Sequence, residues 1–254
     1  MTLSTTAKQR HETLQTLLNQ SKTLDAKFVH NLRVATRRLS EVAAILAAKP
    51  VRTALKNLRK SASELRDLDV TCEHLNQWPM PKPLKTLAKE LIAEMQEKRS
   101  DLEKKLRKAM TSADVTKAMT LLSKTIATAP ASTPAIEKRL SKRQKQLQKK
   151  YATAARLQTD ESLHAARIAT KQLRYILELT TPRPKPELKF LKDVQELLGD
   201  HHDVHVILST LSPRVTAKGL TPVWQKWRQI KEREQSERAA EFFKRDEASS
   251  RSQL

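Results

Sequence analysis

Apolar residues recur at intervals of three and four along most of this chain, which is the spacing of one face of an amphipathic helix. Prolines and short polar stretches interrupt the spacing where turns are expected. Asp25 is a plausible N-cap for the second helix. The pattern predicts helices over residues 6–18, 25–49, 55–75, 84–110, 116–129, 136–157, 160–179 and 188–211, and a last helix that begins at Pro222 and fades into a charged tail from Lys244.

Two of these predicted helices carry similar polar residues. The first copy reads His30-Asn-Leu-Arg33-Val-Ala-Thr-Arg37-Arg38-Leu39, and the second reads His164-Ala-Ala-Arg167-Ile-Ala-Thr-Lys171-Gln172-Leu173-Arg174. At about 100° per residue, one stripe of the first copy holds His30, Arg33, Arg37 and Glu41, and the apolar residues form the opposite stripe. The second copy has the same arrangement, with His164, Arg167, Lys171 and Arg174 on one side. Core packing explains the apolar stripe but places no demand on the residues opposite it. The repetition therefore predicts that both stripes bind a shared anionic ligand.

The correspondence extends into the helices that follow. Leu55-Lys-Asn-Leu-Arg59 matches Leu188-Lys-Phe-Leu-Lys192, and the Leu65–Val70 segment matches Leu198–Val204 with one residue inserted. A duplication of about 130 residues explains these matches. We expect one domain over residues 1–254, made of pseudo-symmetric halves of about 1–129 and 130–254, each roughly a four-helix bundle, around a basic groove or pore.

Composition supports an all-α fold. Only two of the 254 residues are glycine, whereas tight hairpins, dinucleotide-binding crossovers and phosphate-binding loops all use glycine. The content of 38% apolar and 30% charged residues is typical of a soluble globular protein. The fold class that we predict is all-α, with helices joined by short links that proline often marks.

Charge narrows the class of partner. The formal net charge is +21, and such an excess is typical of proteins that bind a polyanion or a negatively charged surface. The single Cys72 has no partner for an internal disulfide, and no stretch approaches the ~20 apolar residues of a membrane span. Residues 1–20 lack the continuous apolar block of a secretory signal. We therefore expect a cytoplasmic protein without a membrane span.

The scarcity of glycine implies that side-chain cations bind the anion, since glycine loops are the other common means of holding phosphate. A single arginine on a helix is more often a solvated residue, and a single histidine is more often a packing residue; the duplication argues against both readings here. We also expect each histidine to donate to a phosphoryl oxygen, so that affinity rises as the pH falls toward about 6.5. The candidate binding residues are His30, Arg33, Arg37, Arg38, Arg59, Arg66, His164, Arg167, Lys171, Arg174 and Lys192.

Three further groups have modest expected roles. Asp67, Asp69 and Asp203 are expected to orient neighbouring basic side chains or to cap helices. His201 and His205 have the spacing of a metal-binding pair, but no third ligand lies at a recognisable spacing, so we predict no metal site. The last helix is expected to turn three residues inward, namely Trp224, Trp227 and Ile230.

These residues resemble the CHAD domain, a histidine-bearing α-helical domain named for its two His-x-x-Arg helices. The likeness rests on four elements in the family's order and covers nearly the whole chain. The elements are His30-x-x-Arg33 with Thr36 to Leu39, Leu65-Arg-Asp-Leu-Asp-Val70, His164-x-x-Arg167 with Lys171 and Arg174-Tyr175, and Leu197-Leu-Gly199 with Asp203.

The resemblance implies non-catalytic binding of inorganic polyphosphate, with no cofactor. It also implies that a basic helix supplies pore-facing residues, for which we select Lys142 and Arg143. Some relatives carry a triphosphate tunnel (CYTH) domain, whose Glu-x-Glu-x-Lys motif is absent here, so we expect a stand-alone form. The chain departs from the family's usual pattern at Ser40, at Gln172 and at the pair His201-His202.

Three alternatives stay open from the sequence. Nucleic acid is a rival, weaker polyanionic partner, although 4% aromatic residues and the lack of a helix-turn-helix or zinc-finger spacing disfavour it. Phosphoanhydride cleavage would need clustered carboxylates for a metal, and the acidic residues are scattered. The resemblance also allows a scaffold role on polyphosphate or polymer granules.

Overall fold

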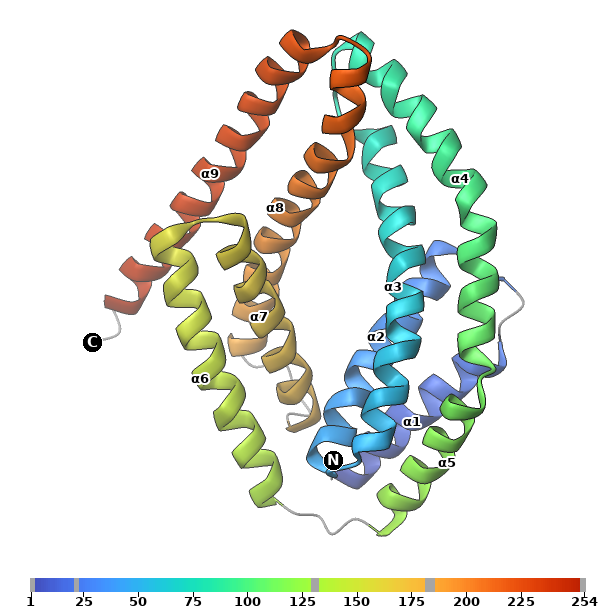
Figure 1. The fold of residues 1–254 in the computed structure, drawn as a ribbon. Helices are drawn as coiled ribbons and strands as arrows, with labels where there is room; N and C mark the ends of the chain where they lie inside the picture. Colours follow the sequence, from blue (N-terminus) through green and yellow to red (C-terminus); the bar gives the residue numbers. More distant parts are fainter. Residues whose placement is uncertain (1–2, 21–22, 129–132, 181–185, 252–254) are drawn as a thin grey trace. The chain divides into compact units, whose positions relative to one another are not determined.

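The computed structural model describes residues 3–20, 23–128, 133–180 and 186–251, and these residues form helices and their links with no strand (Figure 1). The predicted all-α class is therefore confirmed. No helix of the described part is both long and apolar enough to cross a membrane. The helices are α1 (Leu3–Asn19), α2 (Ala26–Ile45), α3 (Lys49–Gln77), α4 (Lys82–Met110), α5 (Ala113–Thr128), α6 (Thr133–Leu157), α7 (Asp160–Thr180), α8 (Pro186–Ala217) and α9 (Thr221–Arg251).

Helix α2 begins where the sequence predicted and ends earlier. The Asp25 carboxylate accepts a hydrogen bond from the backbone N–H of Phe28 at 2.7 Å, which confirms the predicted N-cap. The helix ends at Ile45 rather than near residue 49, because Ala47 adopts a left-handed conformation with φ of 54°. The N–H of Ala48 then reaches back to the carbonyl of Ala43 at 2.9 Å, as in a Schellman motif.

The two C-terminal helices run further than predicted. Helix α8 continues past Pro213 to Ala217, although proline removes a backbone donor from the helix interior. Helix α9 begins around Pro222 as predicted and continues through the charged segment to Arg251. Trp224 and Trp227 are buried, as expected. The prediction for Ile230 was wrong, since this side chain is 47% exposed.

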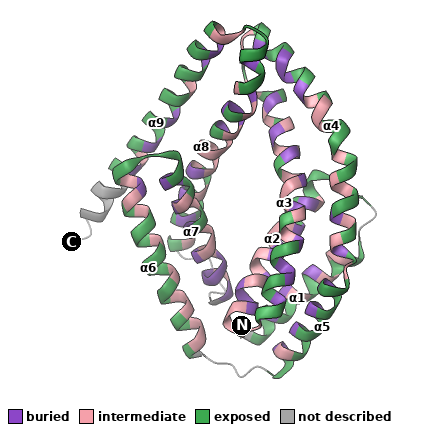
Figure 2. Ribbon diagram, in the orientation of Figure 1, coloured by how far each residue is buried: buried purple, intermediate pink, exposed green. Residues whose placement is uncertain are grey.

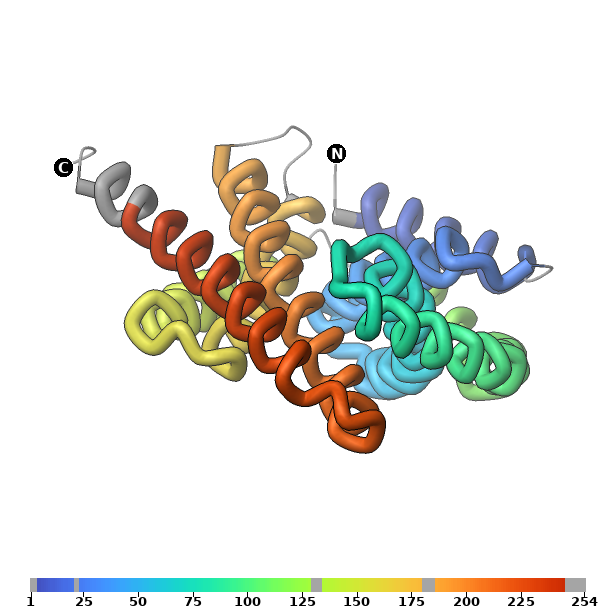
Figure 3. Tube along the Cα trace, turned by 90° about the horizontal axis from the view of Figure 1, so that it is seen from above, coloured from blue at the N-terminus to red at the C-terminus, as the bar shows by residue number. Residues whose placement is uncertain are grey.

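The chain divides into two compact units. Unit 1 comprises residues 1–70, 94–143 and 172–185, and unit 2 comprises residues 71–93, 144–171 and 186–254. Helices α3, α4, α6 and α7 contribute residues to both units. Figure 3 colours the chain by residue number, so that each range can be located. Each unit thus draws on both sequence halves, and the division into halves at about residue 129 stays a prediction about duplication.

The core of unit 1 is built mainly from α2 and α3, and α1 packs on α2 and α5. Leucines dominate this core because each helix buries one apolar stripe, seen as the purple positions in Figure 2. Helix α7 adds Leu179 from its C-terminal part. Fully buried members on the other helices include Leu14, Leu32, Leu39, Leu58, Leu65, Leu106 and Leu122.

Unit 2 has its own core, and α8 packs on α9 within it. Ala154 of α6 and Ala166 of α7 pack in one cluster with apolar residues of α8, and Phe243 of α9 belongs to the same cluster. The ring of Tyr151 meets the ring of Phe243 edge-on, with 5.2 Å between centroids. The apolar side of α2 therefore packs in the core of unit 1, and the apolar side of the first part of α7 packs in the core of unit 2. The buried members are Ala154, Leu163, Ala166, Val194, Leu198, Ala239 and Phe243.

Candidate functional site: two clusters of basic residues

The duplicated helices share one buried feature besides their leucines. Thr36 of α2 and Thr170 of α7 occupy equivalent positions, and both are fully buried. The Thr36 hydroxyl donates to the carbonyl of Arg33 at 2.9 Å, and the Thr170 hydroxyl donates to the carbonyl of Ala166 at 2.9 Å. These bonds satisfy the hydroxyl groups inside each helix, so the repeated threonine belongs to the helix's buried side.

In unit 1, Arg33 lies mostly covered on α2. Its Nη1 donates to Asp67 of α3 at 3.1 Å, and its side chain is only 17% exposed. Burial and the nearby charge of Arg37 lower the pKa of Arg33 to about 10, and Asp67 only partly offsets this effect. The buried Nε of Arg33 makes no hydrogen bond with any described residue. Arg33 therefore stays charged at neutral pH and has one buried donor that is not satisfied.

Two neighbouring arginines have no acidic partner. Within the described residues, Arg37 of α2 and Arg66 of α3 form no ion pair and no side-chain hydrogen bond, and both are half-buried. Arg59 of α3 is near Arg37, and its Nη1 donates weakly to the Ser40 hydroxyl at 3.4 Å. Burial and the charge of Arg37 lower the pKa of Arg59. This part of unit 1 therefore holds more positive charge than its own acids neutralise.

Glu41 anchors a second part of the same cluster. Its carboxylate is 8% exposed, and Arg139 of α6 approaches one oxygen at 2.9 and 3.1 Å. Arg143, one helical turn further along α6, reaches the other oxygen at 3.0 Å and also donates to the side-chain oxygen of Gln172. Sequence reasoning missed Arg139, although its spacing of four from Arg143 marks one helix face. Lys142 is exposed and lies on another side of α6.

Glu178 of α7 anchors a third part. It accepts from Arg38 of α2 at 2.9 Å, and it lies 3.3 Å from Arg174 and 3.8 Å from Arg10. The Arg10 guanidinium also donates to the backbone carbonyls of Arg38 at 3.2 Å and Tyr175 at 3.3 Å. Burial lowers the pKa of Arg10 to about 10. Arg10 thus joins both motif helices, and nothing in the pattern of α1 distinguished it.

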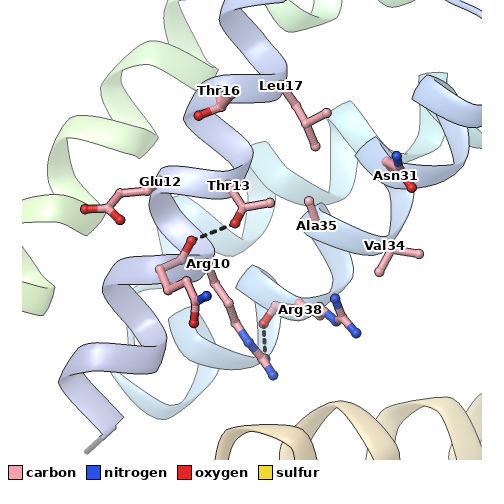
Figure 4. A pocket seen from close by; sticks show the side chains of 10 residues that line it. Arg10, Glu12, Thr13, Thr16, Leu17, Asn31, Val34, Ala35 and Arg38 are labelled. Carbon is pink, nitrogen blue, oxygen red and sulfur yellow. Dashed lines mark hydrogen bonds between the residues drawn. The ribbon is translucent and has the colours of Figure 1, made fainter. Parts of the chain in front are cut away.

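A pocket of about 500 Å³ lies between α1 and α2 beside this anchor (Figure 4). Arg10 and Arg38 line it together with Thr13, Asn31 and Val34. Arg33 and Arg37 are not among its lining residues. The pocket therefore belongs to a neighbouring face of α2, and it does not contain the predicted basic stripe.

In unit 2, residues of α7 and α8 lie around His164 of the second motif. The ring of His202 from α8 lies 4.8 Å from the ring of His164, centroid to centroid. Burial, followed by the charge of Arg167, lowers the pKa of both histidines, and that of His202 falls to about 4. Gly199 of α8 sits against Arg167, because a Cβ atom at this position would lie 3.9 Å from the guanidinium. Sequence reasoning noted His202 only as a departure from the family.

The histidines that suggested a metal site contact an acid instead. His205 Nδ1 lies 2.7 Å from one oxygen of Asp160, and His201 Nε2 lies 3.6 Å from the other. Among the residues that the structure describes, no three histidine, cysteine or acidic side chains are arranged to hold a metal ion. Asp160 is the first residue of α7, where a carboxylate also interacts favourably with the helix dipole.

Comparison with known proteins decides the family. The CHAD domain model matches residues 7–212 of the chain. The chain belongs to the CHAD domain family. A solved crystal structure, that of the CHAD domain from the plant Ricinus communis, is similar to the chain with a TM-score of 0.69 and 24% identity, over 92% of this chain and 85% of that one. At this identity the likeness shows a common fold, and no curated protein matches the chain.

The structure also gives the exposure and contacts of the remaining predicted residues of this CHAD domain. His30 and Lys192 are exposed on α2 and α8. Asp67 orients Arg33 as predicted, and Asp69 likewise orients an arginine, since it accepts from Arg99 Nε at 2.9 Å. Asp203 differs from the prediction, because it lies 3.4 Å from His74 Nε2 rather than beside a lysine or arginine.

The Glu41 anchor gives a prediction about stability. We expect Glu41→Ala to lower the free energy of unfolding by about 3 kcal/mol, because it leaves two partly buried guanidinium groups without their counter-charge. Urea denaturation measures the change. The control is Glu12→Ala on an exposed position of α1, where a change within about 0.5 kcal/mol is expected. Equal losses in the two variants would contradict the anchoring role.

Proposed function

We propose that this CHAD domain binds inorganic polyphosphate, or a closely similar linear polyanion, without cleaving it. The observation that carries the proposal is the excess of half-buried guanidinium charge in unit 1. Asp67, which is exposed, is the ion-pair partner of Arg33, and the acid whose charge acts on Arg59 is Glu41, which already pairs with Arg139 and Arg143. Arg37 and Arg66 form no ion pair within the described residues. Partly buried cations that repel one another raise the free energy of the unbound protein, and a bound anion lowers it.

The chemistry of the donors fits phosphoryl oxygens. Arginine presents a planar fork of N–H groups that matches two oxygens of one phosphate. The Nε atom of Arg33 is buried and makes no hydrogen bond with the described residues, so Arg33 has one unsatisfied donor beside the basic cluster. His164, Arg167 and Lys171 add a second group of donors in unit 2. We propose that each group binds phosphoryl oxygens, consistent with the duplication.

Several anchored acids support a non-catalytic role. Glu41, Glu178 and Asp69 each accept from arginine side chains. Carboxylates held in this way are poorly placed to coordinate the metal ion that phosphoanhydride cleavage normally needs. Release of phosphate from polyphosphate in the presence of Mg²⁺ or Mn²⁺ would overturn this part of the proposal. A cytoplasmic or granule-bound location stays a prediction.

The first test removes single charges that have no acidic partner. We expect Arg37→Gln and Arg66→Gln each to weaken binding of long-chain polyphosphate by about tenfold, since a charge-assisted hydrogen bond contributes roughly 1.5 kcal/mol. Calorimetric titration at fixed ionic strength measures the affinity. Lys124→Gln on α5 is the matched control, because it removes the same charge from an exposed position. Equal weakening in all three variants would indicate a general field effect instead of a site.

The second test separates polyphosphate from nucleic acid. With a fluorescent single-stranded oligonucleotide bound to the protein, we expect long-chain polyphosphate to displace it at a lower concentration of phosphate groups than an unlabelled oligonucleotide does. The reason is that half-buried guanidinium forks suit bare phosphoryl chains, whereas few aromatic rings are available to stack bases. Stronger displacement by the oligonucleotide would favour the nucleic-acid alternative.

A further inference from the structure

Two imidazole rings face one another across α7 and α8 in unit 2. The centroids of His164 and His202 are 4.8 Å apart, and the ring planes are inclined by 44°. Both rings line a pocket of about 450 Å³. His164 is exposed and His202 is half-buried, so an anion from solvent has access to the pair. The pair therefore forms one wall of an open site.

Charged and titratable groups from both helices surround this pair. On the α7 side, the charges of Arg167 and Lys171 act on both histidines. Asp160 and Glu161 line the pocket one turn before His164, and Asp160 is already engaged by His201 and His205 of α8. Asp203 of α8, which follows His202 in the sequence, contacts His74 of α3. Along α7 the two cations thus follow His164, and the engaged carboxylate of Asp160 precedes it.

This arrangement disfavours a proton on either ring while the site is empty. Two imidazolium ions 4.8 Å apart would repel each other, and the two basic side chains add to that repulsion. Consistent with this geometry, the pKa of His164 lies below its ordinary value and that of His202 lies at about 4. At neutral pH both rings are uncharged, and each offers one donor and one acceptor.

A phosphoryl group changes this balance. An anion held by Arg167 and Lys171 next to the pair compensates their charges and accepts hydrogen bonds from protonated rings. We propose that His164 and His202 form a phosphoryl-binding subsite of the polyphosphate site that takes up a proton when it binds its ligand. The inference rests on the proposed function and adds a pH response to it. Affinity then rises as the pH falls through the pKa of the bound form, and the gain levels off below the pKa of the free form.

Calorimetry tests the proton uptake directly. Titrations with polyphosphate of one defined length are run at pH 6.0 in MES and in imidazole buffer, whose different enthalpies of ionisation reveal the number of protons exchanged. We expect net uptake for the unmodified protein and clearly less for His202→Gln. If the pKa of one ring rises from about 4 to about 6.5 on binding, the unmodified protein binds about tenfold more tightly at pH 5.5 than at pH 7.5. The same ratio should fall to within about twofold in His202→Gln.

A matched variant separates this subsite from histidine content in general. His74→Gln removes an imidazole from the same unit that does not line the pocket, and it should keep the full proton uptake. Circular dichroism confirms that the variants are folded. Equal proton uptake in the unmodified protein and in His202→Gln would overturn the inference while leaving polyphosphate binding intact. Absence of any binding at both pH values would instead overturn the proposed function.

Discussion

The structure of unit 1 depends on holding several guanidinium charges close together beside an apolar core. Burial and mutual repulsion both oppose this arrangement. Glu41 and Glu178 make it possible, because Glu41 pairs with two arginines of α6 and Glu178 pairs with arginines of α2 and α7. They leave Arg37 and Arg66 without acidic partners among the described residues. The two carboxylates thus stabilise the cluster without neutralising all of it, and the charge that remains is the basis of the proposed binding.

Unit 2 also brings basic side chains close together, but it limits their repulsion in another way. There the neighbours of Arg167 and Lys171 are imidazoles, which avoid repulsion by staying neutral. An arginine cluster keeps its charge at every physiological pH, whereas a histidine pair gains charge only when an anion or a low pH favours it. The two duplicated helices therefore carry the same histidine and basic spacing but provide electrostatically different surroundings for a ligand.

Much of the fold followed from the sequence, because helical periodicity and proline breaks are local signals. The N-cap at Asp25 and the burial of Trp224 were predictable for that reason. The end of α2 was not, since it depends on Ala47 adopting a conformation that favours glycine. Contacts between helices were hardest: Arg10 and His202 take part only because α1 packs on α2 and α8 lies beside α7, and no spacing within one helix encodes that.

The salt dependence of polyphosphate affinity tests the central claim most directly. If released counterions accompany contacts between guanidinium groups and phosphates, the logarithm of the association constant falls linearly with the logarithm of salt concentration. Arg37→Gln should then reduce the magnitude of that slope by about one, while Lys124→Gln leaves it unchanged. An affinity that does not vary with salt, or a slope that is the same in the unmodified protein and in Arg37→Gln, would contradict binding by the unneutralised arginines of unit 1.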